Sequence, residues 1–220
     1  VEILHHAHLL NPSFLLMHKG FCVETNLSVA KNWGLGTPST LINNVAQLFE
    51  VDAFLLLQNS FGGSGYDIAN AQNDGPIVYQ RVNHKFLVTP CAFKPKFHQH
   101  LYFVYLNKKQ DSKAAIANYR NKQANLFEAI ELVSKITDSL LIEDTLEGFI
   151  SLLQKHENLL SDILKTPKVQ DLYFPDFKGV VKSLGAWGGD FVMVASHTNC
   201  SNYFKEKGFD TILNFEEMIL

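Results

Sequence analysis

The stretch that decides the fold is Trp33-Gly34-Leu35-Gly36-Thr37-Pro38-Ser39-Thr40. Beyond it, apolar residues recur at the spacing of one helical face, namely Leu41, Ile42, Val45, Leu48 and Phe49. The pattern predicts a helix with Thr37 as its N-cap and Pro38 as its first residue. Amides at a helix start lack internal partners and favour an anion such as phosphate. The stretch therefore predicts either a phosphate-binding turn or a plain tight turn capped by Thr37. It is not a Walker A loop, because the Gly-Lys-Ser/Thr ending is absent.

A second glycine-rich turn, Phe61-Gly62-Gly63-Ser64-Gly65, precedes a predicted helix through Tyr66, Asp67, Ile68 and Ala69. Asp67 follows Ser64 by three residues, which is the spacing of a capping box. A carboxylate at such a turn is also suited to accept a proton from a substrate hydroxyl. Both interpretations of Asp67 stay open at this point.

The third turn is Ser183-Leu184-Gly185-Ala186-Trp187-Gly188-Gly189-Asp190. It follows a helix that we predict from Phe177, Val180, Val181 and Leu184, so Gly185 is explained as its C-cap. Gly188 and Gly189 need another reason, such as close approach of the backbone to a strand or a ligand.

The remaining pattern alternates strands and helices. We expect helical character from Ile3 to Leu16 and strands at Phe21–Leu27, 77–81, 86–88, 101–106 and 191–195, with a last strand near Thr211. Long amphipathic helices are predicted over 126–140 and 146–164, with a shorter one near Tyr203. A connector at Cys91–His100 predicts a boundary that divides residues 1–95 from residues 96–220. The order indicates an α+β sandwich with helices on one face of a mostly antiparallel sheet.

Composition excludes several classes of protein. The chain has 220 residues, 46% of them hydrophobic, and a net charge of -3, which disfavours nucleic acid and membrane surfaces as partners. Its apolar runs are shorter than the roughly 20 residues of a membrane-spanning helix. Its 3 scattered cysteines form neither a disulfide framework nor a metal knuckle, so we expect a reducing cytoplasm.

Taken together, the three turns resemble the GHMP kinase superfamily, which includes mevalonate kinase and phosphomevalonate kinase. Gly34-Leu35-Gly36-Thr37-Pro38-Ser39 resembles the family's second motif, and Gly63-Ser64-Gly65-Tyr66-Asp67 resembles the segment that carries the catalytic aspartate of mevalonate kinase. Residues 185–190 resemble the glycine-rich third motif. The string Gly65-Tyr66-Asp67-Ile68-Ala69 is similar to the bacterial GYDIA subgroup. The resemblance implies a ribosomal S5 domain 2-like first part and a ferredoxin-like second part, with the active site between them.

The resemblance also implies roles for individual residues. ATP and Mg2+ would be the cofactors, with the phosphates held at Gly34, Leu35, Gly36, Thr37, Pro38 and Ser39. Asp67 would be catalytic. Ser64, Gly65, Gly185, Ala186, Trp187, Gly188 and Gly189 would line the substrate site. The implied acceptor is mevalonate or phosphomevalonate. Separately from the resemblance, Lys108, Lys109 and Lys113 follow the strand at 101–106 and are either contacts for a phosphate or carboxylate of the substrate or part of a solvated charged loop.

Two departures from the family pattern matter. Pro38 stands where a family serine reaches magnesium, so Thr37 or Ser39 would have to supply the hydroxyl. The family's first motif is a strand and turn near the N-terminus that helps to form the nucleotide pocket, and because it has no counterpart before Val1 we expect an N-terminal segment to be absent from this sequence. These departures keep two alternatives open: an enzyme similar to mevalonate diphosphate decarboxylase, and a degenerate member that binds without turnover.

Overall fold

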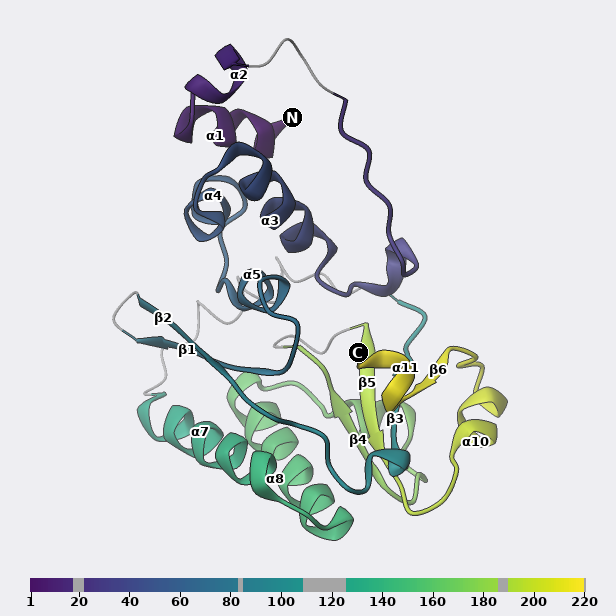
Figure 1. Cartoon of the computed structure of the whole chain (residues 1–220). Helices are drawn as coiled ribbons and strands as arrows, with labels where there is room; N and C mark the ends of the chain where they lie inside the picture. Colours follow the sequence, from purple (N-terminus) through teal and green to yellow (C-terminus); the bar gives the residue numbers. More distant parts are fainter. Residues whose placement is uncertain (18–21, 83–84, 109–125, 186–189, 220) are drawn as a thin grey trace. The chain divides into compact units, whose positions relative to one another are not determined.

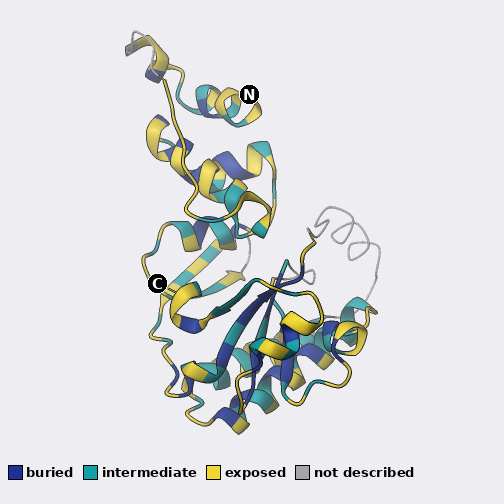
Figure 2. Ribbon diagram, turned by 90° about the vertical axis from the view of Figure 1, so that its right-hand side faces the viewer, coloured by how far each residue is buried: buried dark blue, intermediate teal, exposed yellow. Residues whose placement is uncertain are grey.

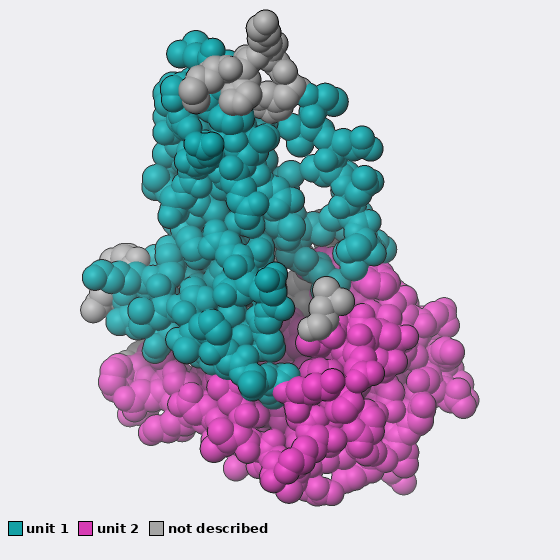
Figure 3. Space-filling model, viewed as in Figure 1, with its two compact units in different colours: residues 1–31, 35–93 teal, residues 32–34, 94–220 magenta. Residues whose placement is uncertain are grey.

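The computed structural model describes residues 1–17, 22–82, 85–108, 126–185 and 190–219. The chain forms two compact units, coloured separately in Figure 3. Unit 1 contains residues 1–31 and 35–93, and unit 2 contains residues 32–34 and 94–220. The three residues 32–34 thus belong to unit 2 although the chain on both sides of them belongs to unit 1.

Unit 1 is built mainly from helices (Figure 1). These are α1 (Glu2–Leu10), α2 (Ser13–Met17), α3 (Thr37–Phe49), α4 (Ala53–Ser60) and α5 (Tyr66–Ala71). Each contributes apolar side chains to one core, made of Ala7, Phe14, Ile42, Val45, Ala46, Phe49, Ala53, Leu56, Leu57 and Ile68. The predicted stripe of α3 is confirmed at Ile42, Val45 and Phe49, which are buried. Such side chains each stabilise the fold by about 1.5–3 kcal/mol, so α3 is fixed by packing.

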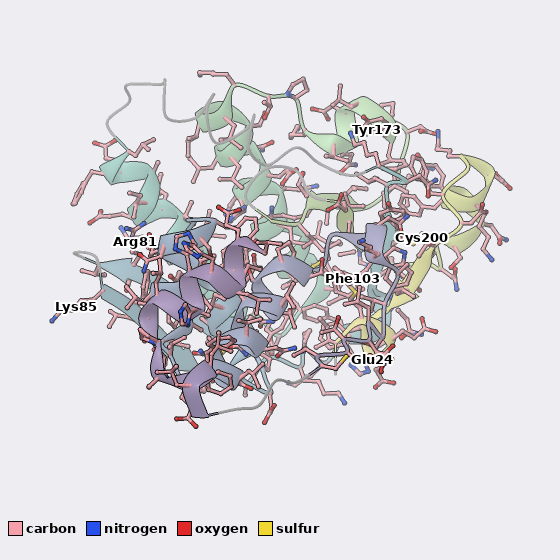
Figure 4. The ribbon with its side chains drawn as sticks, turned by 90° about the horizontal axis from the view of Figure 1, so that it is seen from above. Glu24, Arg81, Lys85, Phe103, Tyr173 and Cys200 are labelled. Carbon is pink, nitrogen blue, oxygen red and sulfur yellow. The ribbon has the colours of Figure 1, made fainter. Side chains whose placement is uncertain are left out.

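A β-hairpin completes unit 1. Strand β1 (Ile77–Val82) pairs antiparallel with β2 (Lys85–Pro90), as the sequence predicted. Phe86 of β2 stacks on Phe54 of α4 and on Tyr79 of β1, with ring centroids 4.6 and 6.1 Å away. The guanidinium of Arg81, labelled in Figure 4, lies over the Phe86 ring, 5.9 Å from its centroid. The hairpin is therefore joined to the helices by aromatic packing.

Unit 2 contains a four-stranded antiparallel sheet. Its strands are β3 (Leu101–Tyr105), β4 (Val180–Ser183), β5 (Phe191–Ala195) and β6 (Ile212–Asn214), in the spatial order β4-β5-β3-β6. Helices α7 (Phe127–Ile142), α8 (Leu146–Leu164) and α9 (Val169–Tyr173) lie between β3 and β4 in the chain, and α10 (Ser201–Glu206) lies between β5 and β6. This β-α-β-β-α-β order is the ferredoxin-like arrangement. The α+β class expected from the sequence is confirmed.

Helices cover both faces of this sheet, so the expectation of helices on one face only is wrong. One face packs on α9 (Val169–Tyr173) and α10 through a core of Val104, Leu106, Val169, Phe174, Val181, Val192, Val194, Cys200 and Phe204. The alternate residues face α8 (Leu146–Leu164), where Lys182 meets Glu157. Helix α7 (Phe127–Ile142) runs beside α8 (Figure 1). Because both faces are covered, β3 and β5 are almost continuously buried and appear dark blue in Figure 2.

Two further elements differ from the sequence prediction. Residues 22–27, the described part of the predicted strand Phe21–Leu27, form no regular structure and are exposed. A strand needs a partner for its hydrogen bonds, and in the described part of unit 1 the two strands pair with each other. The predicted helix over 177–184 is instead the strand β4. Val180 and Val181 are both buried, and a strand covered on both faces shows no alternation to distinguish it from a helix.

Three shorter elements complete the described chain. These are the 3-10 helices η1 (Lys31–Trp33) and η2 (His98–His100) and the helix α11 (Phe215–Met218). Within the described ranges, no helix combines the length and the apolar character needed to cross a bilayer.

Candidate active site

The first candidate segment is the start of α3. Gly36 is the N-cap, with φ of 67°, and no side chain caps the helix. The prediction that Thr37 is the N-cap is therefore wrong: Thr37 is the first helical residue and Pro38 the second. Glycine takes this left-handed conformation without steric cost, so the turn can begin one residue earlier than a threonine cap would allow.

Because no side chain caps α3, the first amide groups of this helix remain available as hydrogen-bond donors. The first intrahelical bond runs from the Thr40 amide to the Gly36 carbonyl, at 3.0 Å. The amides that precede Thr40 have no acceptor within the helix, and Pro38 has no N–H to offer. Thr37 and Ser39 thus combine an amide and a hydroxyl at the positive end of the helix dipole, where an anion is stabilised.

Asp67 lies next to this helix start. It is the second residue of α5, whose N-cap is Gly65 with φ of 88°, and no side chain caps that helix. The capping-box interpretation of Asp67 and Ser64 is therefore wrong. A Cβ built on Gly36 would lie 3.5 Å from Oδ1 of Asp67, which is ordinary van der Waals contact. Asp67 thus faces the turn at the start of α3.

The environment of Asp67 makes it more basic than a free carboxylate. Burial raises the pKa of Asp67 above its ordinary value of 3.8, and a hydrogen bond from Tyr66 offsets part of this rise. Burial, together with the neighbouring Asp67 charge, raises the pKa of Tyr66 to about 12, so its hydroxyl keeps its proton. A carboxylate with a raised pKa is a better proton acceptor.

Side chains outside the three motifs hold this arrangement. Tyr79 of β1 donates a hydrogen bond from its hydroxyl to the carbonyl of Ser64. The Phe54 ring and the Tyr79 hydroxyl both lie within 3.2 Å of a Cβ built on Gly65, so a side chain at that position would be crowded as well as strained by the φ of 88°. Buried Asn43 of α3 donates to the Ala71 carbonyl at 3.5 Å and accepts from Gln72 at 3.1 Å. Helices α3 and α5 are thereby fixed to each other, and with them Gly36 and Asp67.

Two of the other predicted site residues, Gly34 and Gly185, belong to unit 2, whereas Gly36 and Asp67 belong to unit 1. A Cβ built on Gly34 would overlap the carboxylate of Asp190. Gly185 has φ of 72° and lies in the turn after β4, so it is not a helix C-cap, because the helix that it was expected to end is a strand. The predicted site residues Ala186, Trp187, Gly188 and Gly189 lie outside the described residues.

Lys108 is held by an aromatic residue of unit 2. Its Nζ donates to the Tyr173 hydroxyl at 2.8 Å and lies 4.8 Å from the centroid of the Tyr173 ring, which is labelled in Figure 4. Lys109 and Lys113 lie outside the described residues. The proposed contact of these lysines with an anionic acceptor stays a prediction.

Sequence reasoning missed Tyr79 and the contact of Gly34 with Asp190. Tyr79 reads as an ordinary strand residue, and Asp190 as the end of a glycine-rich turn. No local sequence pattern identifies Tyr79 or Asp190, because each contacts its partner only in the folded chain.

The hydroxyl and amide groups at the start of α3 suit a nucleotide better than a metal ion alone. In the described part of the chain, no three or more His, Cys, Asp or Glu side chains gather to hold a metal. Magnesium bound with a nucleotide takes most of its ligands from phosphates and water, so one or two protein oxygens are enough. Thr37 and Ser39 offer such oxygens at the same helix start that offers amides to phosphate.

Comparisons with known proteins bear on the fold. No protein-family model and no curated protein sequence matches the chain. Solved structures do match. The Lin0012 protein from Listeria innocua has a TM-score of 0.64 at 15% identity over 99% of this chain and 75% of its own. Phosphomevalonate kinase from Streptococcus pneumoniae has a TM-score of 0.59 at 15% identity over 97% and 83%.

A mevalonate kinase structure also matches, with a TM-score of 0.53 at 22% identity over 79% of this chain and 56% of the kinase. At these identities the likeness shows the fold. Together with the α+β architecture of the described units, it shows that this chain has a GHMP kinase-like fold.

Proposed function

We propose that this chain is an ATP-dependent phosphotransferase of the GHMP kinase type, which acts on a hydroxyl or phosphate of a small metabolite. One observation supports this most directly: the Asp67 carboxylate lies against Gly36, at the start of a helix with no side-chain cap. Phosphoryl transfer needs an anion site beside a group that orients or deprotonates the acceptor, because catalysis consists largely of positioning and charge stabilisation. Both parts occur within unit 1.

In this proposal, the helix start binds the phosphates. The amides of Thr37 and Ser39 point out of the first turn of α3, and positive φ at Gly36 lets the backbone approach the ligand without a side chain in between. Pro38 lacks an amide hydrogen, so it adds no donor, but it fixes the backbone for the helix start. Gly34 and Leu35 complete the proposed phosphate turn.

Asp67 accepts the proton of the attacking hydroxyl. Its raised pKa follows from burial, and its position is fixed by the turn that Tyr79 supports. Ser64 and Gly65 shape the acceptor side of the turn, and residues 185–189 are proposed to contribute to the substrate site. Magnesium bound with the nucleotide would neutralise charge that develops on the phosphates. The hydroxyls of Thr37 and Ser39 are its proposed protein ligands.

The proposed acceptor is mevalonate or phosphomevalonate. The motif around Asp67 resembles those branches, and two of the structures with this fold are a mevalonate kinase and a phosphomevalonate kinase. Within the superfamily we place the chain closest to the GYDIA subgroup, on Gly65-Tyr66-Asp67-Ile68-Ala69. A small-molecule partner also fits the net charge of -3, which gives no basic stripe for nucleic acid or anionic lipid.

The test is phosphate transfer from ATP by the full chain with Mg2+, against mevalonate, phosphomevalonate, homoserine and galactose. Asp67→Asn should lower kcat about a hundredfold or more if Asp67 takes part in proton transfer. The control is Asp74→Asn, which makes the same change at an exposed position after α5. ATP binding without turnover on any acceptor would favour a degenerate binding member. ATP-dependent loss of carbon dioxide from mevalonate diphosphate would favour the decarboxylase.

A further inference from the structure

Residues 32–34 stand out because they change units. Lys31 and Leu35 belong to unit 1, yet the residues between them pack within unit 2. The chain therefore leaves unit 2 at Gly34 and begins α3 of unit 1 only three residues later, at Thr37. We call residues 32–34 the unit 2 anchor of the proposed phosphate turn.

Tyr105, the last residue of β3, holds the anchor by hydrogen bonds. Its hydroxyl donates to the Asn32 carbonyl at 3.0 Å and accepts from Asn32 Nδ2 at 3.2 Å. Tyr105 is only 6% exposed, so water competes poorly for its hydroxyl. A buried hydroxyl that both donates to and accepts from one residue fixes that residue in position and in orientation.

Aromatic packing holds the next residue. The Trp33 ring meets the Phe191 ring edge to face, with centroids 5.4 Å apart at 77°. Phe191, the first residue of β5, is 2% exposed and also packs on Tyr105 at 5.3 Å. The anchor therefore rests on two neighbouring strands that the sheet holds in register, since Tyr105 pairs with Phe191.

Gly34 ends the anchor against Asp190. Its φ is 66°, and the Asp190 carboxylate fills the space that a Cβ would need. Both the backbone conformation and the close approach require glycine at this position. Each of the three anchor residues thus has its own contact in unit 2, and the backbone direction is fixed where the chain enters the phosphate turn.

We propose that Tyr105 is a positioning residue that sets the conformation of the phosphate turn before nucleotide binds; this rests on the proposed function. A free turn must be ordered when ligand binds, and each ordered residue costs affinity. The anchor orders the turn in advance. Loss of the Tyr105 hydroxyl should therefore weaken nucleotide binding although that hydroxyl does not contact the nucleotide.

The experiment compares Tyr105→Phe with Tyr102→Phe in the full chain. Both variants lose one hydroxyl from β3, but Tyr102 points to the opposite face and packs against the core near α10. Amide hydrogen exchange is measured over residues 30–36 without nucleotide, and the dissociation constant of Mg-ATP is measured by calorimetry. We expect Tyr105→Phe to speed exchange in that segment and to weaken Mg-ATP binding about tenfold. Tyr102→Phe should do neither.

The outcomes separate this inference from the proposed function. Unchanged exchange in Tyr105→Phe would overturn the anchor, and faster exchange with unchanged affinity would overturn its link to nucleotide. Equal effects of both variants would mean that any lost hydroxyl loosens unit 2, which also overturns the inference. If the unaltered chain binds no Mg-ATP, the proposed function fails, and the exchange result alone decides whether Tyr105 fixes the segment.

Discussion

The Asp67 carboxylate lies against Gly36, so the helix that carries the acid and the helix start that offers amides meet within one compact unit. Asn43 and Gln72 hold the two helices together by hydrogen bonds to the backbone and to each other. The carboxylate caps neither helix, so capping does not account for the position of Asp67.

The pH dependence of the reaction should reflect the ionisation of the Asp67 carboxyl group. Burial raises its pKa, so the acidic limb of kcat/KM should lie above the ordinary carboxyl value of 3.8. Activity rises with pH through this limb as the carboxylate loses its proton. The measurement is a pH profile with saturating Mg-ATP. A limb unchanged in the residual activity of Asp67→Asn would assign it to another group.

Replacing Asp67 by asparagine should not destabilise the fold. A carboxyl whose pKa is raised by folding stabilises the protein when protonated, and this contribution is lost as pH rises through the raised pKa. Asp67→Asn stays neutral, so its melting temperature should equal or exceed that of the unaltered chain at pH 7, and the difference should shrink towards pH 4. A lower melting temperature at pH 7 would mean that the carboxylate makes a stabilising contact.

Gly36→Ala should weaken Mg-ATP binding at least about tenfold, beyond its effect on stability. The matched control is Gly62→Ala, because both glycines have φ of 67° and both substitutions should cost about 1–2 kcal/mol of backbone strain. Gly62 has no neighbour within 4 Å of a built Cβ, whereas Gly36 faces Asp67. Calorimetric titration distinguishes the two, and equal losses of affinity would argue against a phosphate site at α3.

Gly34 and Asp190 should couple in a double-mutant cycle. Gly34→Ala introduces a Cβ that overlaps the Asp190 carboxylate, in addition to strain from the positive φ. Asp190→Ala removes the overlap but leaves the strain. The double variant should therefore be more stable than the two single losses predict, by about 1–3 kcal/mol. Denaturant unfolding of all four proteins provides the measurement, and additive losses would mean that the contact does not constrain Gly34.

Replacing only one partner of the buried ion pair of unit 2 should strongly destabilise the fold. Glu157 and Lys182 are 6% and 8% exposed and lie 3.0 Å apart, and Glu157 also accepts from the amide and the hydroxyl of Ser183. Glu157→Leu leaves Lys182 buried without its partner and should cost about 3–5 kcal/mol. Adding Lys182→Met should recover part of this loss, because the unpaired charge is gone while Ser183 still lacks its acceptor. If denaturant unfolding shows no recovery of stability in the double variant, the loss of the acceptor for Ser183 accounts for most of the cost of Glu157→Leu.

Much of the architecture follows from the sequence alone. The helices α3, α7 and α8 and the strands β1, β2, β3 and β5 were predicted from the period at which their apolar residues recur. Glycine-rich turns before helices likewise identified Gly36 and Asp67 as candidates. Local chemistry was sufficient for these elements.

The tertiary structure decided which strands pair and which distant residues contact one another. Residues 177–184 have the spacing of a helix, yet pairing with β5 and cover on both faces make 180–183 a strand. Residues 22–27 have the composition of a strand, but no strand of the described unit pairs with them. The contacts of Gly36 with Asp67, Ser64 with Tyr79 and Asn32 with Tyr105 join residues far apart in the chain. Sequence periodicity reports which face of an element is buried, but the identity of the opposing group depends on how the whole chain packs.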